Sequence, residues 1–309
     1  MQNLRGSLLM VGAMAGFALE DLFIKQLAGD MPMGEVIALI GCGGTVNFGT
    51  LALLNGRRLL SPAVLSRPVI LRNLGEMIAS ASFVSALVLT TLSSASAILQ
   101  AAPLAVTLGA ALFLAEPVGW RRWSAIGIGF LGVLLIIQPG MAGFTPASLL
   151  AVVAVGAIAL RDLASRTVPP AIGSVQLSTW AFFSLIPTGL LMMLAMGDAP
   201  MLPHAADLVR LVGAFAVGGF GYYALVGATR TGDVAVVVPF RYTRLVFAMI
   251  LGRLVFGEHP DAFMLAGAAL VVVAGLYTIG REARLRRRVS ARPARTPACS
   301  DEGALECER

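Results

Sequence analysis

Long apolar runs alternate with short polar stretches from about residue 6 to residue 279. Ten of these runs are close to the length that a helix needs to cross about 30 Å of hydrocarbon. Because lipid offers the backbone no hydrogen-bond partners, each run is predicted to be helical. The predicted spans are 6–27, 34–54, 69–92, 96–114, 123–137, 147–163, 175–195, 211–228, 234–256 and 263–279. The pattern therefore predicts an all-α membrane protein with ten transmembrane helices.

Two segments of the chain nearly repeat each other. The stretch 17–22 reads FALEDL and is followed by Lys25, whereas 158–163 reads IALRDL and is followed by Arg166. Further similarities join 112–117 to 254–259. The chain is therefore predicted to be a tandem duplication, with repeats over residues 1–140 and 145–281. Each repeat holds five spans, an odd number, so the second enters the membrane upside down; this inverted-repeat design is found in transporters.

The charged residues are few and unevenly placed. The chain is 57% hydrophobic and 13% charged, which excludes an ordinary soluble domain. Its net charge of +6 is explained by the positive-inside rule better than by nucleic-acid binding. The cations gather in alternate loops and after the last span: Arg57, Arg58, Arg67, Arg121, Arg122, Arg166, Arg230, Arg281, Arg284, Arg286, Arg287 and Arg288. Both termini are therefore predicted to be cytoplasmic, in a multi-pass inner-membrane protein, with residues 282–309 as a disordered tail.

The side chains that usually carry catalysis or metal binding are scarce. Three cysteines show no disulfide or metal spacing, and the two histidines, His204 and His259, fall in predicted loops. No metal, cofactor or enzymatic activity is expected. The expected partners are a small-molecule solute and the bilayer, with the protein a monomer or homodimer.

Three features occur in the corresponding spans of the two repeats, although the two prolines do not align with each other. A cation lies late in the first span (Lys25 and Arg166), a proline lies inside the fourth (Pro103 and Pro239), and the fourth span ends in a glutamate (Glu116 and Glu258). With the repeat itself, these features resemble the EamA-domain branch of the drug/metabolite transporter superfamily, over about residues 5–280. The resemblance implies a central cavity lined by both halves and no ATP-binding domain. The stretch 14–25 is also similar to a bacterial subgroup of riboflavin uptake permeases.

Ionisable residues within spans are candidates for function, because each is costly in lipid and must face a cavity or a partner. Asp21 and Lys25 are spaced i,i+4, as are Asp162 and Arg166, so two pairs within single helices are predicted to brace the cavity ends.

Glu20 has no such partner in its own helix, and its counterpart in the second repeat is Arg161. These two could pair across the repeats, or each could meet a ligand. Arg72 and Glu76 are predicted to form an interfacial salt bridge. Glu116 and Glu258 are expected to be helix-end anchors without a transport role.

The remaining candidates suit a planar, hydrogen-bonding solute. Trp180, Tyr222 and Tyr223 lie in spans seven and eight, where a ring could stack on them, although single aromatics more often pack or anchor at the interface. Gln100 could bind an amide-like edge. Arg241 follows Pro239 near the middle of span nine and is the favoured cation for an anionic or carbonyl-rich solute.

The predicted function is an inner-membrane permease that moves a small organic solute by alternating access. Riboflavin or a related flavin, moving inward, is the preferred substrate. Export of amino acids or other metabolites remains an alternative, as does uptake of S-adenosylmethionine, for which Glu20, Asp21 and Glu76 would serve. A membrane enzyme or a receptor is disfavoured by the scarcity of histidine.

Overall fold

The computed structural model describes residues 2–56, 59, 62–114, 119–141, 144–169, 172–231 and 234–290, and every regular element in these ranges is a helix. The elements are α1 (Gln2–Asp30), α2 (Met33–Leu54), η1 (Pro62–Leu65), α3 (Arg67–Leu89), α4 (Leu92–Leu99), α5 (Ala102–Phe113), α6 (Trp120–Ile137), α7 (Ser148–Ser165), α8 (Ser174–Met196), α9 (Ala205–Thr231), α10 (Val234–Val237), η2 (Val238–Tyr242), α11 (Thr243–Phe256) and α12 (Ala262–Ser290).

Eight stretches of the described chain are long and apolar enough to cross a membrane: α1, α2, α4 with α5, α6, α7, α8, α9 and α12 as far as Arg281. Two predicted spans fall outside this set for physical reasons. Helix α3 carries Arg67, Arg72 and Glu76 in its first turns, and the segment 234–256 is divided among α10, η2 and α11. The count of ten spans therefore stays a prediction.

The fourth predicted span of each half is broken in mid-course. Helix α4 ends before Gln100, and α5 begins after Ala101 with Pro103 in its first turn. In the second half, Pro239 lies in the first turn of η2, which joins α10 to α11. Proline lacks a backbone N–H and clashes with the preceding turn, so it is tolerated at a helix start and interrupts a helix elsewhere. Both breaks lie beside the cavity described below.

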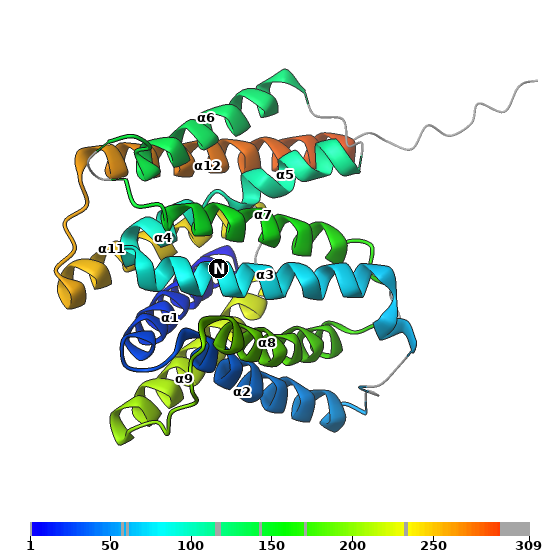
Figure 1. Cartoon of the computed structure of the whole chain (residues 1–309). Coiled ribbons are helices and arrows are strands. Elements are labelled where there is room, and N and C mark those ends of the chain that lie inside the picture. Colours follow the sequence, from blue (N-terminus) through cyan, green and yellow to red (C-terminus); the bar gives the residue numbers. More distant parts are fainter. Residues whose placement is uncertain are drawn as a thin grey trace, which may run out of the picture.

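Each long helix packs mainly against a helix of the other half. The principal pairs are α1 with α9, α3 with α7, α2 with α8, α6 with α12, and α4 with α11. If each predicted span is replaced by its counterpart in the other half, the α1–α9 pair becomes the α7–α3 pair, and the other three pairs of spans are unchanged. The contact pattern therefore has two-fold symmetry. In Figure 1, α6 and α12 lie side by side at the top, α2 and α9 lie at the bottom, and α3 and α7 lie between them.

Glycines bring four of these pairs into backbone contact. A Cβ atom added to Gly34 would lie 2.4 Å from the carbonyl oxygen of Gly189, and one added to Gly132 would lie 2.7 Å from that of Gly267. Small residues allow such close approach between membrane helices, where dispersion contacts replace the hydrophobic effect as the source of association. The α1–α9 and α3–α7 pairs are similarly close, because Cβ atoms added to Gly16 and Gly75 would lie 2.8 Å and 2.9 Å from backbone atoms of Val217 and Arg161.

Helix α12 is longer than the last predicted span. It runs to Ser290 and so enters the segment that was predicted to be disordered. The reason is local, because the sequence 281–288 is rich in arginine, glutamate, alanine and leucine, which favour helix. The prediction of disorder was wrong for 282–290, and residues 291–309 lie outside the described ranges.

Candidate functional site

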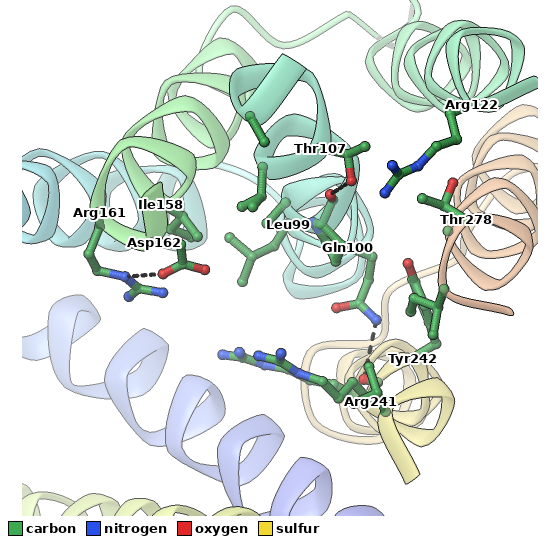
Figure 2. A pocket seen from close by; sticks show the side chains of 18 of the residues that line it. Leu99, Gln100, Thr107, Arg122, Ile158, Arg161, Asp162, Arg241, Tyr242 and Thr278 are labelled. Atoms are coloured by element: carbon green, nitrogen blue, oxygen red, sulfur yellow. Dashed lines mark hydrogen bonds and ion pairs between the residues drawn. The ribbon is translucent and has the colours of Figure 1, made fainter. Parts of the chain in front are cut away.

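A cavity of about 440 Å³ lies between the two halves of the chain. Its walls come from the α4–α5 break, α6, α7, the η2–α11 junction and α12 (Figure 2). The polar and charged lining residues are Gln100, Thr107, Arg122, Arg161, Asp162, Arg166, Arg241, Tyr242, Arg244 and Thr278. Five arginines against one aspartate make the lining strongly cationic.

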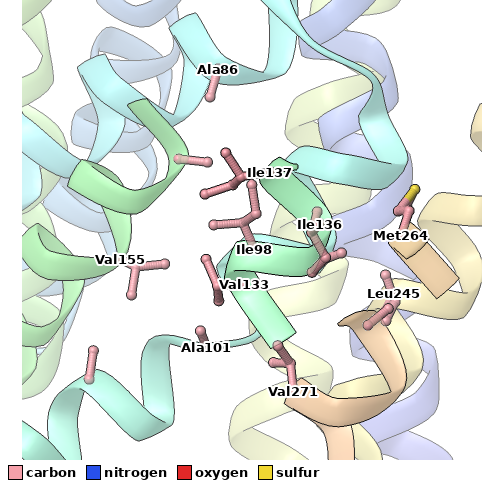
Figure 3. Packing of buried hydrophobic residues seen from close by; sticks show 14 of the residues in the cluster. Ala86, Ile98, Ala101, Val133, Ile136, Ile137, Val155, Leu245, Met264 and Val271 are labelled. Atoms are coloured by element: carbon pink, nitrogen blue, oxygen red, sulfur yellow. The ribbon is translucent and has the colours of Figure 1, made fainter. Parts of the chain in front are cut away.

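An apolar cluster fixes the wall at the α4–α5 break. Ile98 is 1% exposed and packs with Val133 of α6, Val155 of α7 and Val271 of α12 (Figure 3). Burying side chains of this size is worth about 1.5–3 kcal/mol each. Because Gln100 follows this anchored turn by two residues, its position at the cavity wall is well defined.

Arg161 belongs to a network of charges between α3 and α7. Its Nε donates to Asp162 at 2.8 Å, and its Nη1 lies 3.4 Å from Oε1 of Glu76. Glu76 is also 3.9 Å from Arg72, which confirms the predicted i,i+4 pair. The two carboxylates hold Arg161 away from Glu20, so the suggested pairing of Glu20 with Arg161 is absent from this structure. The predicted pairing of Asp162 with Arg166 stays a prediction.

Arg244 is fixed by the most buried carboxylate of the site. Asp21, 3% exposed, accepts from Nη2 of Arg244 at 2.7 and 2.8 Å and from Nε at 3.1 Å. The guanidinium also lies 5.6 Å from the ring of Phe17 and 5.9 Å from that of Phe83. Such two-pronged contacts combine charge with fixed geometry. The prediction that Asp21 pairs with Lys25 was wrong, because Arg244 of α11 presents a planar, two-pronged donor to the same carboxylate.

Arg241 is the lining arginine for which the described residues provide no carboxylate partner at ion-pair distance. Its side chain is exposed although the residue lies within the helix bundle, so the exposed surface faces the cavity. Its backbone is held, because the Gln100 side-chain amide donates to the Arg241 carbonyl oxygen at 3.3 Å (Figure 2). Of the predicted substrate-binding residues, Gln100 and Arg241 therefore line the cavity together.

Tyr242 adds a polar group beside Arg241. Its side chain is buried, and its hydroxyl has no hydrogen-bond partner among the described residues. A Cβ atom added to Gly275 of α12 would lie 1.6 Å from that hydroxyl oxygen, so the glycine makes room for the ring. Thr278 and Arg122 line the wall nearby (Figure 2). The hydroxyl oxygen is itself covered by its surroundings, although other parts of the residue line the cavity.

The other predicted substrate-binding residues lie away from this lining. The Trp180 indole, on α8, donates to the Leu59 carbonyl oxygen at 2.9 Å, and its ring packs against the cluster of Val64, Val69 and Ile172. The Tyr222 ring meets that of Phe48 edge-on at 4.9 Å, and Tyr223 is 54% exposed.

Glu20 lies between α1 and α9. A Cβ atom added to Gly218 of α9 would meet its Oε1 at 2.6 Å. The described residues bring no cation within ion-pair distance of Glu20. Glu20 precedes Asp21 in the chain, but it is not among the residues that line the cavity. Sequence reasoning did not assign Arg122, Arg244 or Thr278 to the site. The mid-span position of Arg244, one turn after Arg241, was the available signal.

Five linkers meet at one end of the bundle, which is here named the Glu258 end: 30–33, 89–92, 137–148, 196–205 and 256–262. The 256–262 linker lies at the left in Figure 1. The Glu258 carboxylate accepts from the backbone N–H of Leu92 at 2.5 Å, the N–H of Ser93 at 3.0 Å and the Ser93 hydroxyl at 2.6 Å. A carboxylate is favoured there because it meets free N–H groups and the positive end of the helix dipole. Glu258 therefore anchors α11 to the first turn of α4 in the other half, whereas Glu116 lies outside the described residues.

Further polar contacts join the helices at the Glu258 end. The Lys25 ammonium donates to the Leu87 carbonyl oxygen at 2.7 Å and to that of Thr90, at the end of α3. The Gln138 amide donates to the Asp261 carboxylate, which links α6 to the start of α12. The cavity lies toward the other end of the bundle. It extends from Gln100, at the α4–α5 break, to Arg122 at the start of α6 and Arg166 at the end of α7.

Both halves of the chain match the profile of the EamA-like transporter family, over residues 4–138 and 145–280. The chain belongs to the EamA-like transporter family. The resemblance seen in the sequence is therefore confirmed, and the transporter is an integral protein of the bacterial inner membrane that moves a small-molecule solute.

Several relatives of this transporter carry functional names. It is 30% identical to the riboflavin transporter of Rhizobium johnstonii over 67% of this chain and 68% of that one. It is 27% identical to the S-adenosylmethionine uptake transporter of Rickettsia bellii over 70% and 74% of the two chains. It is 26% identical to the pseudopaline exporter of Pseudomonas aeruginosa over 87% and 94%.

A solved structure titled "Crystal structure of protein" matches with a TM-score of 0.57 at 18% identity. The match covers 93% of this transporter and 99% of that chain. At this identity the likeness concerns the fold alone.

Proposed function

We propose that the transporter is a ten-span permease built as a five-plus-five inverted repeat over residues 1–140 and 145–281, with both termini in the cytoplasm. The two-fold pattern of helix contacts and the odd number of predicted spans per repeat support this architecture. In this orientation the Glu258 end faces outward and is closed, whereas the cavity lies on the cytoplasmic side. The structure then represents an inward-facing state of an alternating-access cycle.

The proposed transport reaction is uptake of riboflavin or a related flavin. The name of the Rhizobium johnstonii relative supports this choice, as does that of a Vibrio cholerae riboflavin transporter at 30% identity. The flavin ring presents carbonyl oxygens and ring nitrogens that accept hydrogen bonds, and Arg241 and Gln100 offer donors. A volume of about 440 Å³ is within the usual range for a small-molecule site.

The charge of the cavity argues against S-adenosylmethionine. Its sulfonium adds a positive charge, and Asp162 is the one carboxylate among the lining residues. In a partly desolvated site the arginines repel a cation more strongly than they would in water. Asp21 and Glu76, which could have served a cationic solute, are already paired with Arg244 and Arg161.

Export of a carboxylate-bearing metabolite is the second candidate. Arginine binds carboxylates in a two-pronged geometry, which suits this lining. The pseudopaline exporter also shows the longest overlap among the relatives described above.

Complementation of a riboflavin auxotroph tests the proposed reaction. Cells that make the transporter should grow on low external riboflavin and take up labelled riboflavin, and Arg241→Gln should abolish the gain. Arg253→Gln is the matched control, because Arg253 lies in the following helix α11 and contacts His259 outside the cavity. If cells with normal amounts of protein gain no flavin uptake but resist toxic metabolites, the export function replaces the proposed one.

Reporter fusions at Arg281 test the orientation. They should be active only in the cytoplasm, and activity on the outer side would reverse the assignment of both faces.

A further inference from the structure

The lining arginines differ in how their charge is balanced. Arg161 contacts the carboxylates of Asp162 and Glu76, and Arg244 is held by Asp21. Arg241 lines the same cavity as these two cations, yet the described residues place no carboxylate within ion-pair distance of it. No carboxylate of the described residues is therefore in direct contact with the Arg241 guanidinium. The carboxylate that acts on it from farther away, Asp162, is already bound by Arg161, and Arg161 and Arg244 add positive charge nearby.

The location of Arg241 makes this imbalance costly. It follows Pro239 in η2, in the middle of the predicted ninth span, and its exposed side chain faces the cavity. Charged residues at such depth are rare and normally face a water-filled cavity or a partner. Its backbone is fixed by the hydrogen bond from Gln100, so the guanidinium projects from a defined place.

A second unused donor belongs to the adjacent residue. The Tyr242 side chain is 6% exposed, and its hydroxyl is buried without a hydrogen-bond partner among the described residues. A buried polar group of this kind is costly unless a ligand or water satisfies it. The hydroxyl oxygen is covered by its surroundings, so of these two neighbours Arg241 is the one whose donors are exposed to the cavity.

We propose that the transported solute carries an acidic group, a carboxylate or a phosphate, that pairs with Arg241. This inference rests on the proposed function in that the solute occupies this cavity. It deepens that proposal, because among flavins it favours those with an acidic substituent over neutral riboflavin.

Riboflavin and riboflavin 5′-phosphate form a matched pair, because they share the ring and differ in one acidic group. Binding of each to the purified full-length transporter is followed by flavin fluorescence. We expect the phosphate to bind at least tenfold more tightly, a difference of about 1.4 kcal/mol. In Arg241→Gln this ratio should fall to about one, whereas Arg241→Lys, which keeps the charge, and the control Arg253→Gln should preserve the preference.

A flavin-independent measurement separates failure of this inference from failure of the flavin proposal. Thermal unfolding is compared in chloride, citrate and inorganic phosphate at one ionic strength, for the unmodified protein and for Arg241→Gln. If neither flavin binds but citrate or phosphate raises the melting temperature only when Arg241 is present, the flavin proposal fails and the acidic-group inference stands. The more stabilising anion then identifies the carboxylate or phosphate class.

Three results would overturn the inference. One is equal binding of riboflavin and its phosphate, which leaves the flavin proposal intact. Another is a preference for the phosphate that persists in Arg241→Gln. The third is the absence of any Arg241-dependent effect in both measurements.

Discussion

Glu258→Gln is expected to loosen the closed end of the transporter. The carboxylate accepts three hydrogen bonds from the first turn of α4, two from backbone N–H groups and one from the Ser93 hydroxyl. Hydrogen bonds to a charged group contribute about 1.5–3 kcal/mol each, and a carboxylate at a helix N-terminus adds about 0.3–1 kcal/mol. Glutamine keeps one acceptor oxygen and loses the charge, so the closed state should lose roughly 2 kcal/mol, which multiplies the ratio of open to closed forms by about 30.

Cysteine labelling measures this shift directly. In a background with Cys42, Cys299 and Cys307 replaced by serine, Gln100→Cys places one thiol at the cavity wall. A membrane-impermeant maleimide added to intact cells reaches this thiol only when the Glu258 end opens. Labelling should accelerate up to about 30-fold in Glu258→Gln, following the population shift derived above.

Asp261→Asn is the control for that experiment. It makes the same acid-to-amide change at the same end, but Asp261 joins α12 to α6 and does not touch α4. The reasoning is refuted if Glu258→Gln is labelled at the unmodified rate, or if Asp261→Asn accelerates labelling equally.

Three further substitutions test the assignment of single residues. Asp21→Asn leaves Arg244 without its carboxylate and should cost about 3–5 kcal/mol, measured as a lower melting temperature that the double variant Asp21→Asn/Arg244→Gln partly restores. Glu20→Gln should cut uptake strongly at unchanged protein level, whereas Glu116→Gln should not; the opposite ranking would contradict a role for Glu20. Trp180→Ala removes a partly buried ring and its hydrogen bond, so it should lower stability by about 0.5–3 kcal/mol while flavin affinity in the remaining folded protein stays unchanged.

Helices and family were readable from the sequence because they depend on local pattern. Apolar runs set the helices, and the FALEDL and IALRDL stretches revealed the repeat. The breaks at Pro103 and Pro239 were also predictable, since proline acts on its own helix. The continuation of α12 to Ser290 was missed because charge and lack of apolar residues were given more weight than helix propensity.

The site was only partly predictable, because its geometry depends on helices distant in sequence. Asp21 was assigned to Lys25 by i,i+4 spacing, but the two-pronged donor came from Arg244 of α11. Trp180 and Tyr222 were chosen for ring chemistry, yet both rings contact other protein groups. The Trp180 indole donates to the Leu59 carbonyl oxygen, and the Tyr222 ring meets the Phe48 ring edge-on. Gln100 and Arg241 flank the two chain breaks, so proximity to a break was the more informative signal.

The interlocked pairing of helices has a consequence for how the chain is assembled in the cell. The principal partners of α1, α2, α3 and α6 all come from the second half, so the first five predicted spans enter the bilayer before those partners exist. At about 5–20 residues per second, synthesis of the second half takes on the order of ten seconds. During that interval the surfaces around Gly34 and Gly132 face lipid, or whatever insertion factor covers them. Gene fragments that encode either half alone should thus yield proteolysed products, and co-expression of both should rescue them.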